Sequence, residues 1–453
     1  MRKVDVLVVG GGASGLQAAI TVKSTYPEKE VVLVRKEQHA LIPCGIPYIF
    51  GSLKDSEQDI LPDKLLTSVG VEILIDEIVD IDVKAHSCTS KARETLIYTK
   101  LILALGSIPT RPKWLKGADL ENVFTIPKNK VYLDDMVRKI SASKHIVVIG
   151  AGFIGVEVSD ELNKKGFKVT LVEIEKTILN KAFDEEFGII AEEHLRERGV
   201  NVITGEGVSE IIGKDGKVNS IQLSTGTKIA TDAVVLSMGY VPNTEIAAKA
   251  NIELNEFGFI RTCEYMRVLP CSNDIVAVGD CAEKRDFVTR KLDRTMLAST
   301  ACAEARTAGM NLYTLSPCKP FTGTIAIYST AIGNHAFGTA GITEARAIQE
   351  NFNIISGSFT GMDTHPGNLS HSHKQTVKLI VAADCGMILG GEVYGGYSTG
   401  ELTNAIGFLI QSRVTVKALL TMQIGTQPLL TGSPAGYPLI KAAEVLAKKM
   451  RDR

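Results

Sequence analysis

The feature that most constrains this chain is a glycine-rich turn that occurs twice, at residues 10–15 and 150–155. Both copies have the pattern G-x-G-x-x-G. Its glycines permit a tight turn, a close backbone approach to a pyrophosphate and close packing of a helix on a strand, with the phosphate at the helix N-terminus. A chain that carries this pattern twice is predicted to contain two dinucleotide-binding units.

The residues around both copies have the pattern of a strand, turn, helix and second strand. A near-continuous apolar run precedes each turn, which is typical of a strand buried on both faces of a parallel sheet. The predicted elements are strand 4–9, helix 16–23 and strand 31–34 in the first unit, and strand 145–149, helix 156–165 and strand 168–172 in the second.

The two units differ at the end of the second strand. Glu173 stands there in the second unit, and an acid at this position binds a ribose 2′-hydroxyl and repels a 2′-phosphate. NADH is therefore predicted over NADPH, with Lys176 and Lys181 as the only indications for NADPH. In the first unit Arg35 takes the place of the acid. Either Glu37 or a backbone group serves the ribose there, or this unit holds its adenosine differently.

Cys44 lies just after the first unit, in the segment Ile-Pro-Cys-Gly-Ile-Pro-Tyr at 42–48. Pro47 ahead of an apolar run is typical of the first turn of a helix, because the missing N–H would be unpaired there. The helix dipole at such a place favours a thiolate. A lone cysteine is more often a small buried hydrophobe, and it is the neighbouring nucleotide units that favour a reactive thiol.

Length and composition exclude several classes of protein. A chain of 453 residues is expected to form two or three domains, and its net charge of −1 provides no basic surface for nucleic acid or an acidic membrane. The eight cysteines have no paired or metal-like spacing, so neither a disulfide framework nor a metal site is predicted. The cysteines other than Cys44 are predicted to be packed core thiols. Without a signal peptide or an apolar run of about 18 residues, the prediction is a soluble, cytoplasmic protein.

Three further strands are predicted to frame the nucleotide units. Apolar runs close on glycine and proline at 99–109 and 233–243, where the chain would leave the first unit and return to it. A third run, 275–280, is followed by a helix at 298–311. It ends at Asp280, which is well placed for a ligand hydroxyl or, alternatively, for a helix N-cap.

From about residue 321 the pattern changes to that of an antiparallel sheet with helices. The predicted elements are strands 324–328, 375–381 and 387–393 and helices 399–412 and 439–449. His365, His371 and His373 lie in a polar loop, and no acid or thiol completes a metal-ligand set with them. A solvated loop is the preferred interpretation.

These motifs together resemble the flavin-dependent pyridine nucleotide–disulfide oxidoreductases. The resemblance rests on both glycine turns, on residues 104–109 and 235–242, and on Gly-Asp-Cys-Ala at 279–282. The Cys-Gly-Ile-Pro-Tyr segment resembles the branch with a single redox cysteine, which includes coenzyme A-disulfide reductases, NADH oxidases, NADH peroxidases and coenzyme A persulfide reductases. The resemblance covers essentially the whole chain and is looser after about residue 310.

The resemblance implies an α/β fold with two Rossmann-like domains, for FAD and NAD(P), and a C-terminal α+β dimerisation domain. The implied boundaries are 1–113 with 245–320 for the FAD domain, 114–244 for the NAD(H) domain and 321–453 for dimerisation. It further implies a homodimer in which the C-terminal domain of one subunit completes the active site of the other.

The resemblance also assigns site residues, with Cys44 as the catalytic thiol against the flavin. Asp280 would bind the ribitol, Phe153 would cover the flavin until nicotinamide displaces it, and Glu157 would lie near the nicotinamide. The implied FAD set is Gly10, Gly12, Ala13, Ser14, Gly15, Arg35, Lys36, Pro43, Ala104, Gly106, Gly279, Asp280 and Ala298. The implied NAD set is Gly150, Gly152, Phe153, Ile154, Gly155, Glu157, Glu173 and Gly239.

Departures from the family pattern narrow the expected activity. His39 stands where the disulfide-pair branch has a second cysteine, so no internal disulfide can form, and a structural or exposed histidine is preferred to an acid–base role. Ala13 replaces the histidine of the peroxidases and water-forming oxidases. The tail at 426–438 does not clearly match the tyrosine-bearing segment of the coenzyme A-disulfide reductases, with Tyr437 as a candidate.

The implied activity is reduction of a sulfur substrate by NAD(P)H through FAD and Cys44. The substrate would be coenzyme A persulfide, a polysulfide or coenzyme A disulfide, and whether coenzyme A binds stays open. The alternative is an NADH oxidase that reduces O₂ to peroxide or water. A third hypothesis, reduction of a small redox protein, predicts a docking surface of one charge sign, for which the near-neutral composition gives no support.

Overall fold

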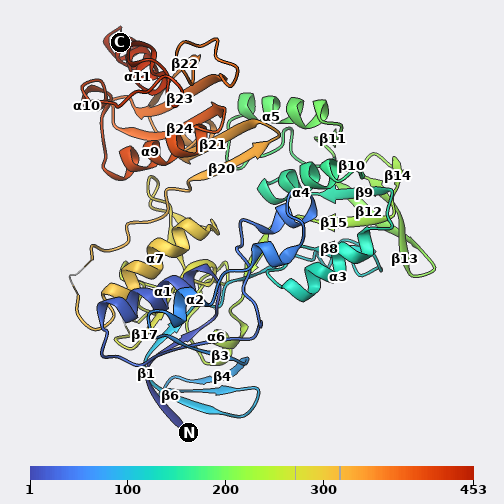
Figure 1. Cartoon of the computed structure of the whole chain (residues 1–453), viewed down its shortest axis with the longest axis vertical. Helices are drawn as coiled ribbons and strands as arrows, with labels where there is room; N and C mark the ends of the chain where they lie inside the picture. Colours follow the sequence, from blue (N-terminus) through green and yellow to red (C-terminus); the bar gives the residue numbers. More distant parts are fainter. Residues whose placement is uncertain (271, 316–317, 453) are drawn as a thin grey trace.

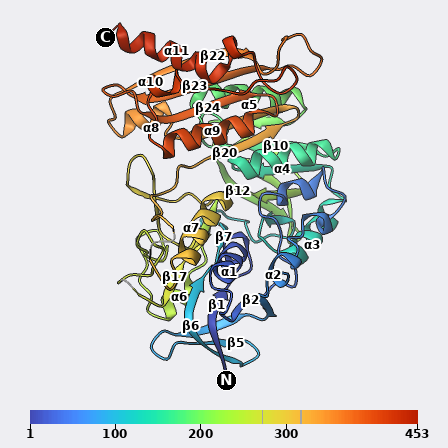
Figure 2. The same cartoon turned by 60° about the vertical axis from the view of Figure 1, so that its left-hand side comes forward.

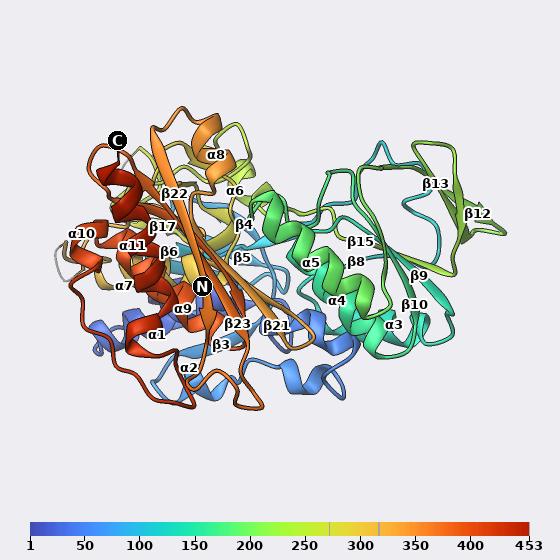
Figure 3. The ribbon, with the colours of Figure 1, turned by 90° about the horizontal axis from the view of Figure 1, so that it is seen from above.

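The computed structural model describes residues 1–270, 272–315 and 318–452, so the prediction of a packed thiol at Cys271 lies outside the described residues. Three regions are visible in Figure 1: the first nucleotide unit at the bottom, the second at the right and the C-terminal region at the top. The N- and C-termini lie at opposite ends of the molecule (Figure 2). Seen from above, the second unit projects to one side of the other two regions (Figure 3).

The first sheet contains the parallel strands predicted around the first glycine turn. β1 (Arg2–Val9) pairs in parallel with β2 (Val31–Arg35) and β6 (Thr95–Leu103), β2 pairs with β3 (Glu72–Ile75), and β17 (Ile275–Ala277) pairs with β6. β5 (Ser87–Ser90) and β4 (Ile78–Asp82) extend the sheet with antiparallel pairs. The helices α1 (Ala13–Thr25) and α7 (Ala298–Met310) pack against each other beside it. Residues far apart in the sequence thus share one core.

The second sheet is parallel throughout, in the order β11-β10-β9-β15-β8. Its strands are β8 (Val123–Thr125), β9 (His145–Ile149), β10 (Lys168–Val172), β11 (Asn201–Ile203) and β15 (Ala233–Leu236). The helices of this unit are α3 (Lys130–Ile140), α4 (Phe153–Lys164) and α5 (Glu185–Glu197), and a small antiparallel sheet forms from β12 (Val208–Lys214), β13 (Lys217–Leu223) and β14 (Lys228–Ala230). The strands are buried on both faces, because the helices cover one face and the small antiparallel sheet covers the other.

The two crossings between the units pair with each other. β7 (Ser107–Pro109) leaves the first unit and β16 (Tyr240–Pro242) returns to it, and the two form an antiparallel ribbon in which Val241 is opposite Ile108. This ribbon accounts for the glycine–proline endings of both apolar runs. The sheets divide the chain in the way the predicted domains do, whereas the predicted boundary residues themselves remain a prediction.

The C-terminal region is a five-stranded antiparallel sheet in the order β20-β21-β24-β23-β22. Its strands are β20 (Tyr328–Ile332), β21 (His335–Gly341), β22 (Ile354–Met362), β23 (Lys374–Ala382) and β24 (Ile388–Gly395). The helices α9 (Thr399–Gln411) and α11 (Pro438–Arg451) pack on it, as predicted. The α+β prediction is therefore confirmed for this region.

Two details of the predictions are wrong. The predicted strand 324–328 is displaced, because β20 begins only at Tyr328, and the segment before it carries just an isolated bridge at Thr324. The prediction that the other cysteines are packed core thiols holds for Cys88 and Cys281, which are buried, but not for Cys385, which is exposed. No described helix is long and apolar enough to cross a membrane.

Candidate functional site

One large cavity runs between the two nucleotide units and reaches the start of β20. Its volume is about 2450 Å³, whereas pockets for one small ligand occupy roughly 300–1,000 Å³. Its lining contains both glycine turns, Cys44, Asp280 and Tyr328. The cavity is therefore large enough for two dinucleotides that meet near Cys44.

The first glycine turn has the geometry that a pyrophosphate requires. Gly10 has a φ of +115°, and a Cβ there would lie 2.1 Å from the carbonyl oxygen of Ala104, so only glycine fits. Gly12 is the N-cap of α1, and a Cβ on it would meet no protein atom within 4 Å. Because no side chain caps this 13-residue helix, its first N–H groups are available to a phosphate. The turn therefore fits the FAD pyrophosphate.

The second glycine turn repeats these features. Gly150 has a φ of +99°, and a Cβ there would lie 2.5 Å from the carbonyl oxygen of Ser237. Gly152, the N-cap of α4, likewise has open space where a Cβ would be, and no side chain caps the helix. The third glycines, Gly15 and Gly155, pack within the turns, where a Cβ would lie 1.9 Å from the carbonyl oxygens of Gly10 and Gly150 respectively.

The ends of the second strands differ in structure as well as in charge. The Glu173 carboxylate accepts hydrogen bonds from the backbone N–H groups of Ala151, at 2.6 Å, and Glu175, at 3.0 Å, and it lines the cavity. The buried Arg35 guanidinium instead donates to both carboxylate oxygens of Asp63, at 2.6 and 2.7 Å. The positive charge of Arg35 is therefore paired with Asp63.

Glu37 lines the cavity two residues after Arg35. Arg35 also donates to the Glu37 carbonyl at 3.0 Å, and the Glu37 side chain is half-buried in the cavity wall, 3.8 Å from the Lys36 ammonium. Burial raises the pKa of the Glu37 carboxyl, and Lys36 opposes that rise.

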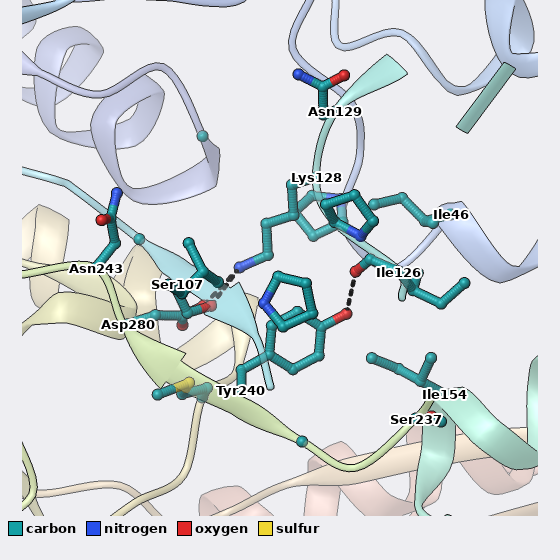
Figure 4. A pocket seen from close by; sticks show the side chains of 18 of the residues that line it. Ile46, Ser107, Ile126, Lys128, Asn129, Ile154, Ser237, Tyr240, Asn243 and Asp280 are labelled. Atoms are coloured by element: carbon teal, nitrogen blue, oxygen red, sulfur yellow. Dashed lines mark hydrogen bonds and ion pairs between the residues drawn. The ribbon is translucent and has the colours of Figure 1, made fainter. Parts of the chain in front are cut away.

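Asp280 joins the two units through Lys128 (Figure 4). The Asp280 carboxylate accepts from the Lys128 ammonium at 2.6 Å and from the Ser107 hydroxyl at 2.7 Å. Burial on its own would raise the pKa of Asp280, but Lys128 and Ser107 outweigh it and hold this pKa below its ordinary value. Tyr240 packs beside Lys128, 5.7 Å from the ammonium to the ring centre, and donates its hydroxyl to the carbonyl of Ile126 at 2.6 Å.

A buried ion pair supports the turn that carries Asp280. Glu304 accepts from the Gly279 N–H at 2.7 Å. The Lys284 ammonium donates to the carbonyls of Gly279, at 3.1 Å, and Ala282, at 2.8 Å, and lies 3.7 Å from Glu304. These contacts fix the backbone of the turn at Gly279 and Ala282.

Cys44 is exposed to the cavity, at the beginning of a short 3₁₀ segment, Ile46–Phe50. Burial among the cavity walls raises the pKa of its thiol, the charge of Glu157 raises it further, and Lys128 lowers it. The prediction that a helix dipole lowers the pKa of the Cys44 thiol is therefore wrong for the protein on its own. The physical reason is that one short 3₁₀ turn supplies little dipole to offset desolvation.

Glu157 and Phe153 line the cavity one helical turn apart on α4. Burial raises the pKa of Glu157 to about 7, and a hydrogen bond from the Thr330 hydroxyl, at 2.8 Å, opposes the rise. The Phe153 ring stacks on Tyr328, with 4.8 Å between ring centres. Both partners belong to β20 of the same chain.

The structure brings nearly all the predicted site residues to this cavity. Only Gly15, Gly155 and Gly279 do not line it, because they pack inside the turns. The sequence interpretation missed Lys128, Ser107, Tyr240, Tyr328 and Thr330. Ser107 and Tyr240 lie in the segments 104–109 and 235–242, but the pattern of those segments assigns them no role. Lys128, Tyr328 and Thr330 belong to no motif, and their roles arise from the spatial proximity of separate regions.

Two other groups of ionisable residues lie outside the cavity. The carboxylates of Asp184, Glu186 and Glu392 lie within 4.8 Å of one another, but the Lys378 ammonium already pairs with them, at 2.8 Å from Asp184 and 2.5 Å from Glu186. In the polar loop, His373 lies 3.4 Å from Asp363, and His365 bonds the carbonyl of Thr431. His371 and His39 are exposed.

Comparison with known proteins identifies the family. Residues 4–305 match the pyridine nucleotide-disulphide oxidoreductases, and residues 327–435 match the dimerisation domain of the same family. The chain belongs to this family of FAD- and NAD(P)H-dependent oxidoreductases.

The named relatives include NADH oxidases and sulfur oxidoreductases. An NADH oxidase of Methanocaldococcus jannaschii is 28% identical, over 99% of both chains. A CoA-dependent NAD(P)H sulfur oxidoreductase of Pyrococcus abyssi is also 28% identical, over 98% of both chains. Among solved structures, an NAD-dependent persulfide reductase from A. fulgidus superposes with a TM-score of 0.90 at 26% identity, covering 99% of this chain and 84% of its own.

Proposed function

We propose that the protein uses NADH to reduce a sulfur substrate through Cys44, the substrate being coenzyme A persulfide, a polysulfide or coenzyme A disulfide. The observation that carries the proposal is the position of one thiol. Of the seven described cysteines, Cys44 alone lines the cavity that contains both glycine turns. The sulfur reductases among the relatives support the same chemistry.

In this proposal FAD lies on the first glycine turn and NADH on the second, and bound FAD relays the two electrons of the hydride. Gly12 and Gly152 admit the two pyrophosphates, Asp280 accepts a ribitol hydroxyl, Glu173 binds the ribose of NADH, and Glu37 serves the ribose of FAD. NADPH is the less favoured donor because Glu173 repels a 2′-phosphate.

Cys44 carries the sulfur chemistry. Its thiolate attacks the outer sulfur of the persulfide, a new S–S bond forms on Cys44, and the displaced coenzyme A thiolate leaves with its electron pair. Two electrons from one NADH then break the new bond, releasing hydrosulfide and restoring the Cys44 thiolate. Lys128, whose charge lowers the Cys44 pKa, favours the attacking form.

We also propose that the protein is a homodimer, because residues 327–435 match a dimerisation domain, and that it acts in the cytoplasm. The C-terminal domain of the partner subunit would then close the Cys44 side of the cavity.

Anaerobic NADH consumption with coenzyme A persulfide, coenzyme A disulfide or polysulfide tests the proposal. We expect turnover with at least one of them, lost by about a hundredfold or more in Cys44→Ser. Cys385→Ser is the matched control, because this exposed thiol does not line the cavity. Turnover that survives in Cys44→Ser would make Cys44 a structural residue.

The second candidate is an NADH oxidase, which is favoured by the NADH oxidases among the relatives. Its reaction delivers the electrons to O₂ and does not need Cys44 as a carrier of sulfur. NADH oxidation that requires O₂ and is unchanged in Cys44→Ser would support this candidate.

A further inference from the structure

The strand β20, from the C-terminal region, packs across the cavity face of α4 (Figure 1). Phe153 and Glu157 are four residues apart and therefore share one face of the helix. Tyr328 and Thr330 are two residues apart and share one face of the strand. Phe153 contacts Tyr328, and Glu157 contacts Thr330. A helix of the second nucleotide unit and a strand of another sheet therefore form one surface.

The aromatic contact is close to parallel. The ring centres of Phe153 and Tyr328 are 4.8 Å apart, and the ring planes differ by 7°. Both rings are half-buried and both line the cavity. The Tyr328 hydroxyl lies 3.4 Å from the Thr295 hydroxyl, which is too long to hold the ring alone. Stacking on Phe153 is therefore the main contact that holds the Tyr328 ring at the cavity.

The polar contact lies beside it. The Thr330 hydroxyl donates to the Glu157 carboxylate at 2.8 Å, and Thr330 is buried. Among the described residues, no basic side chain pairs with the Glu157 carboxylate. Glu161 on its own helix adds a like charge, and Tyr48 and Cys44 face it from the loop across the cavity. Thr330 is therefore the group that fixes the orientation of this carboxylate.

We propose that Tyr328 and Thr330 are positioning residues for the nicotinamide end of NADH, holding Phe153 and Glu157 in the arrangement that accepts the dinucleotide. The inference rests on the assignment of NADH to the second glycine turn. It adds two residues of a different region, which belong to neither of the two glycine motifs. Holding both side chains in place before binding reduces the ordering that binding must supply.

Titration of the FAD-loaded enzyme with NAD⁺, followed by flavin absorbance or calorimetry, tests the proposal without turnover. Tyr328→Leu and Thr330→Val should each weaken NAD⁺ binding about three- to tenfold, with FAD content unchanged. Tyr328→Phe keeps the stacked ring, and Thr330→Ser keeps the hydroxyl, so both should bind as the wild type does. Unchanged NAD⁺ affinity in Tyr328→Leu and Thr330→Val would overturn the proposal, as would tighter binding.

The pH dependence separates a positioning role from a loss of packing. Because the Thr330 hydroxyl lowers the Glu157 pKa, Thr330→Val should move the pH midpoint of NAD⁺ binding upward, whereas Tyr328→Leu should leave it in place. An identical midpoint in Thr330→Val and wild type would contradict the role of Thr330. If NAD⁺ binding behaves as expected while no sulfur compound is reduced, the proposed sulfur activity fails and this inference stands.

Discussion

The two nucleotide units have the same glycine turn, but the residues that follow the turn differ between them. Gly12 and Gly152 cap their helices with nearly identical backbone angles, φ −74° and −70°. One residue and five residues further on, the first unit has Ala13 and Gln17, whereas the second has Phe153 and Glu157. The shared part is fixed by what a pyrophosphate needs. The parts that differ lie where each unit must bind a different ligand.

The strand ends show the same division. Arg35 donates its hydrogen bonds to Asp63 and to backbone carbonyls, so its role is to stabilise the protein. Glu173 instead accepts hydrogen bonds from two backbone N–H groups at the cavity wall. Matched substitutions in the two units therefore separate ligand binding from stability.

The largest effect is expected from Gly12→Ala and Gly152→Ala. An added methyl group meets no protein atom at either position, so both variants should fold, but the methyl occupies the space of a pyrophosphate. Gly12→Ala should lose FAD affinity, and Gly152→Ala NADH affinity with FAD retained, each by roughly a hundredfold, or about 3 kcal/mol. Flavin content after gel filtration and NAD⁺ titration measure this. Loss of FAD in both variants would refute the assignment of separate sites.

Glu157→Gln makes the second helix resemble the first at this position. Glu157 has a pKa of about 7 in the folded protein, against an ordinary 4.5. The proton it holds stabilises the fold fully below pH 4.5, and this stability is lost as pH rises to about 7. The loss is about 3 kcal/mol.

Urea unfolding of both proteins at pH 5 and pH 8 measures that difference. Unfolding free energy should fall by about 2.5 kcal/mol more in wild type than in Glu157→Gln over this range, because Glu304 and the other buried acids titrate in both. Parallel pH profiles would mean that Glu157 is ionised at ordinary pH.

Arg35→Met tests whether the first strand end is structural. The substitution removes the hydrogen bonds to Asp63 and leaves two backbone carbonyls without their donor. We expect a loss of about 2 kcal/mol in unfolding free energy. Lys36→Met is the control, because that side chain is 54% exposed and should change stability by less than about 0.5 kcal/mol. Equal effects of the two substitutions would remove the distinction between the strand ends.

The smallest effect is expected from Glu173→Gln, which removes the charge and keeps an oxygen acceptor for one of the two backbone N–H groups. NADH binding should weaken only about threefold, while NADPH should bind several-fold more tightly because the repulsion of its phosphate is gone. The ratio of the two dissociation constants is the measurement. An unchanged ratio would mean that Glu173 does not face the ribose.

The sequence predicted the parts of the site that depend on neighbouring residues. A glycine turn between a strand and a helix is local, so both turns, their helices and the parallel strands could be derived from the pattern. The assignment of Cys44 and Asp280 to one site followed from the family resemblance, and both residues line the cavity. These predictions depend on features within about ten residues of each other or on a known motif.

The remainder of the site depends on contacts between regions that no local pattern describes. Lys128 meets Asp280 across 152 residues, and Thr330 meets Glu157 across 173. The acidity of Cys44 was predicted wrongly because the helix dipole is a sequence-level inference, whereas burial and the charge of Glu157 are visible only in three dimensions. Residues outside the glycine motifs thus complete a site whose centre the motifs specify.

The measurement that tests the central claim most directly is anaerobic rapid mixing of the NADH-reduced enzyme with coenzyme A persulfide, followed by flavin absorbance. The account predicts fast reoxidation in the wild type. In Cys44→Ser it predicts normal reduction by NADH and no reoxidation by the persulfide. Equal reoxidation by persulfide in the two proteins would contradict the account, because electrons would then reach sulfur without Cys44.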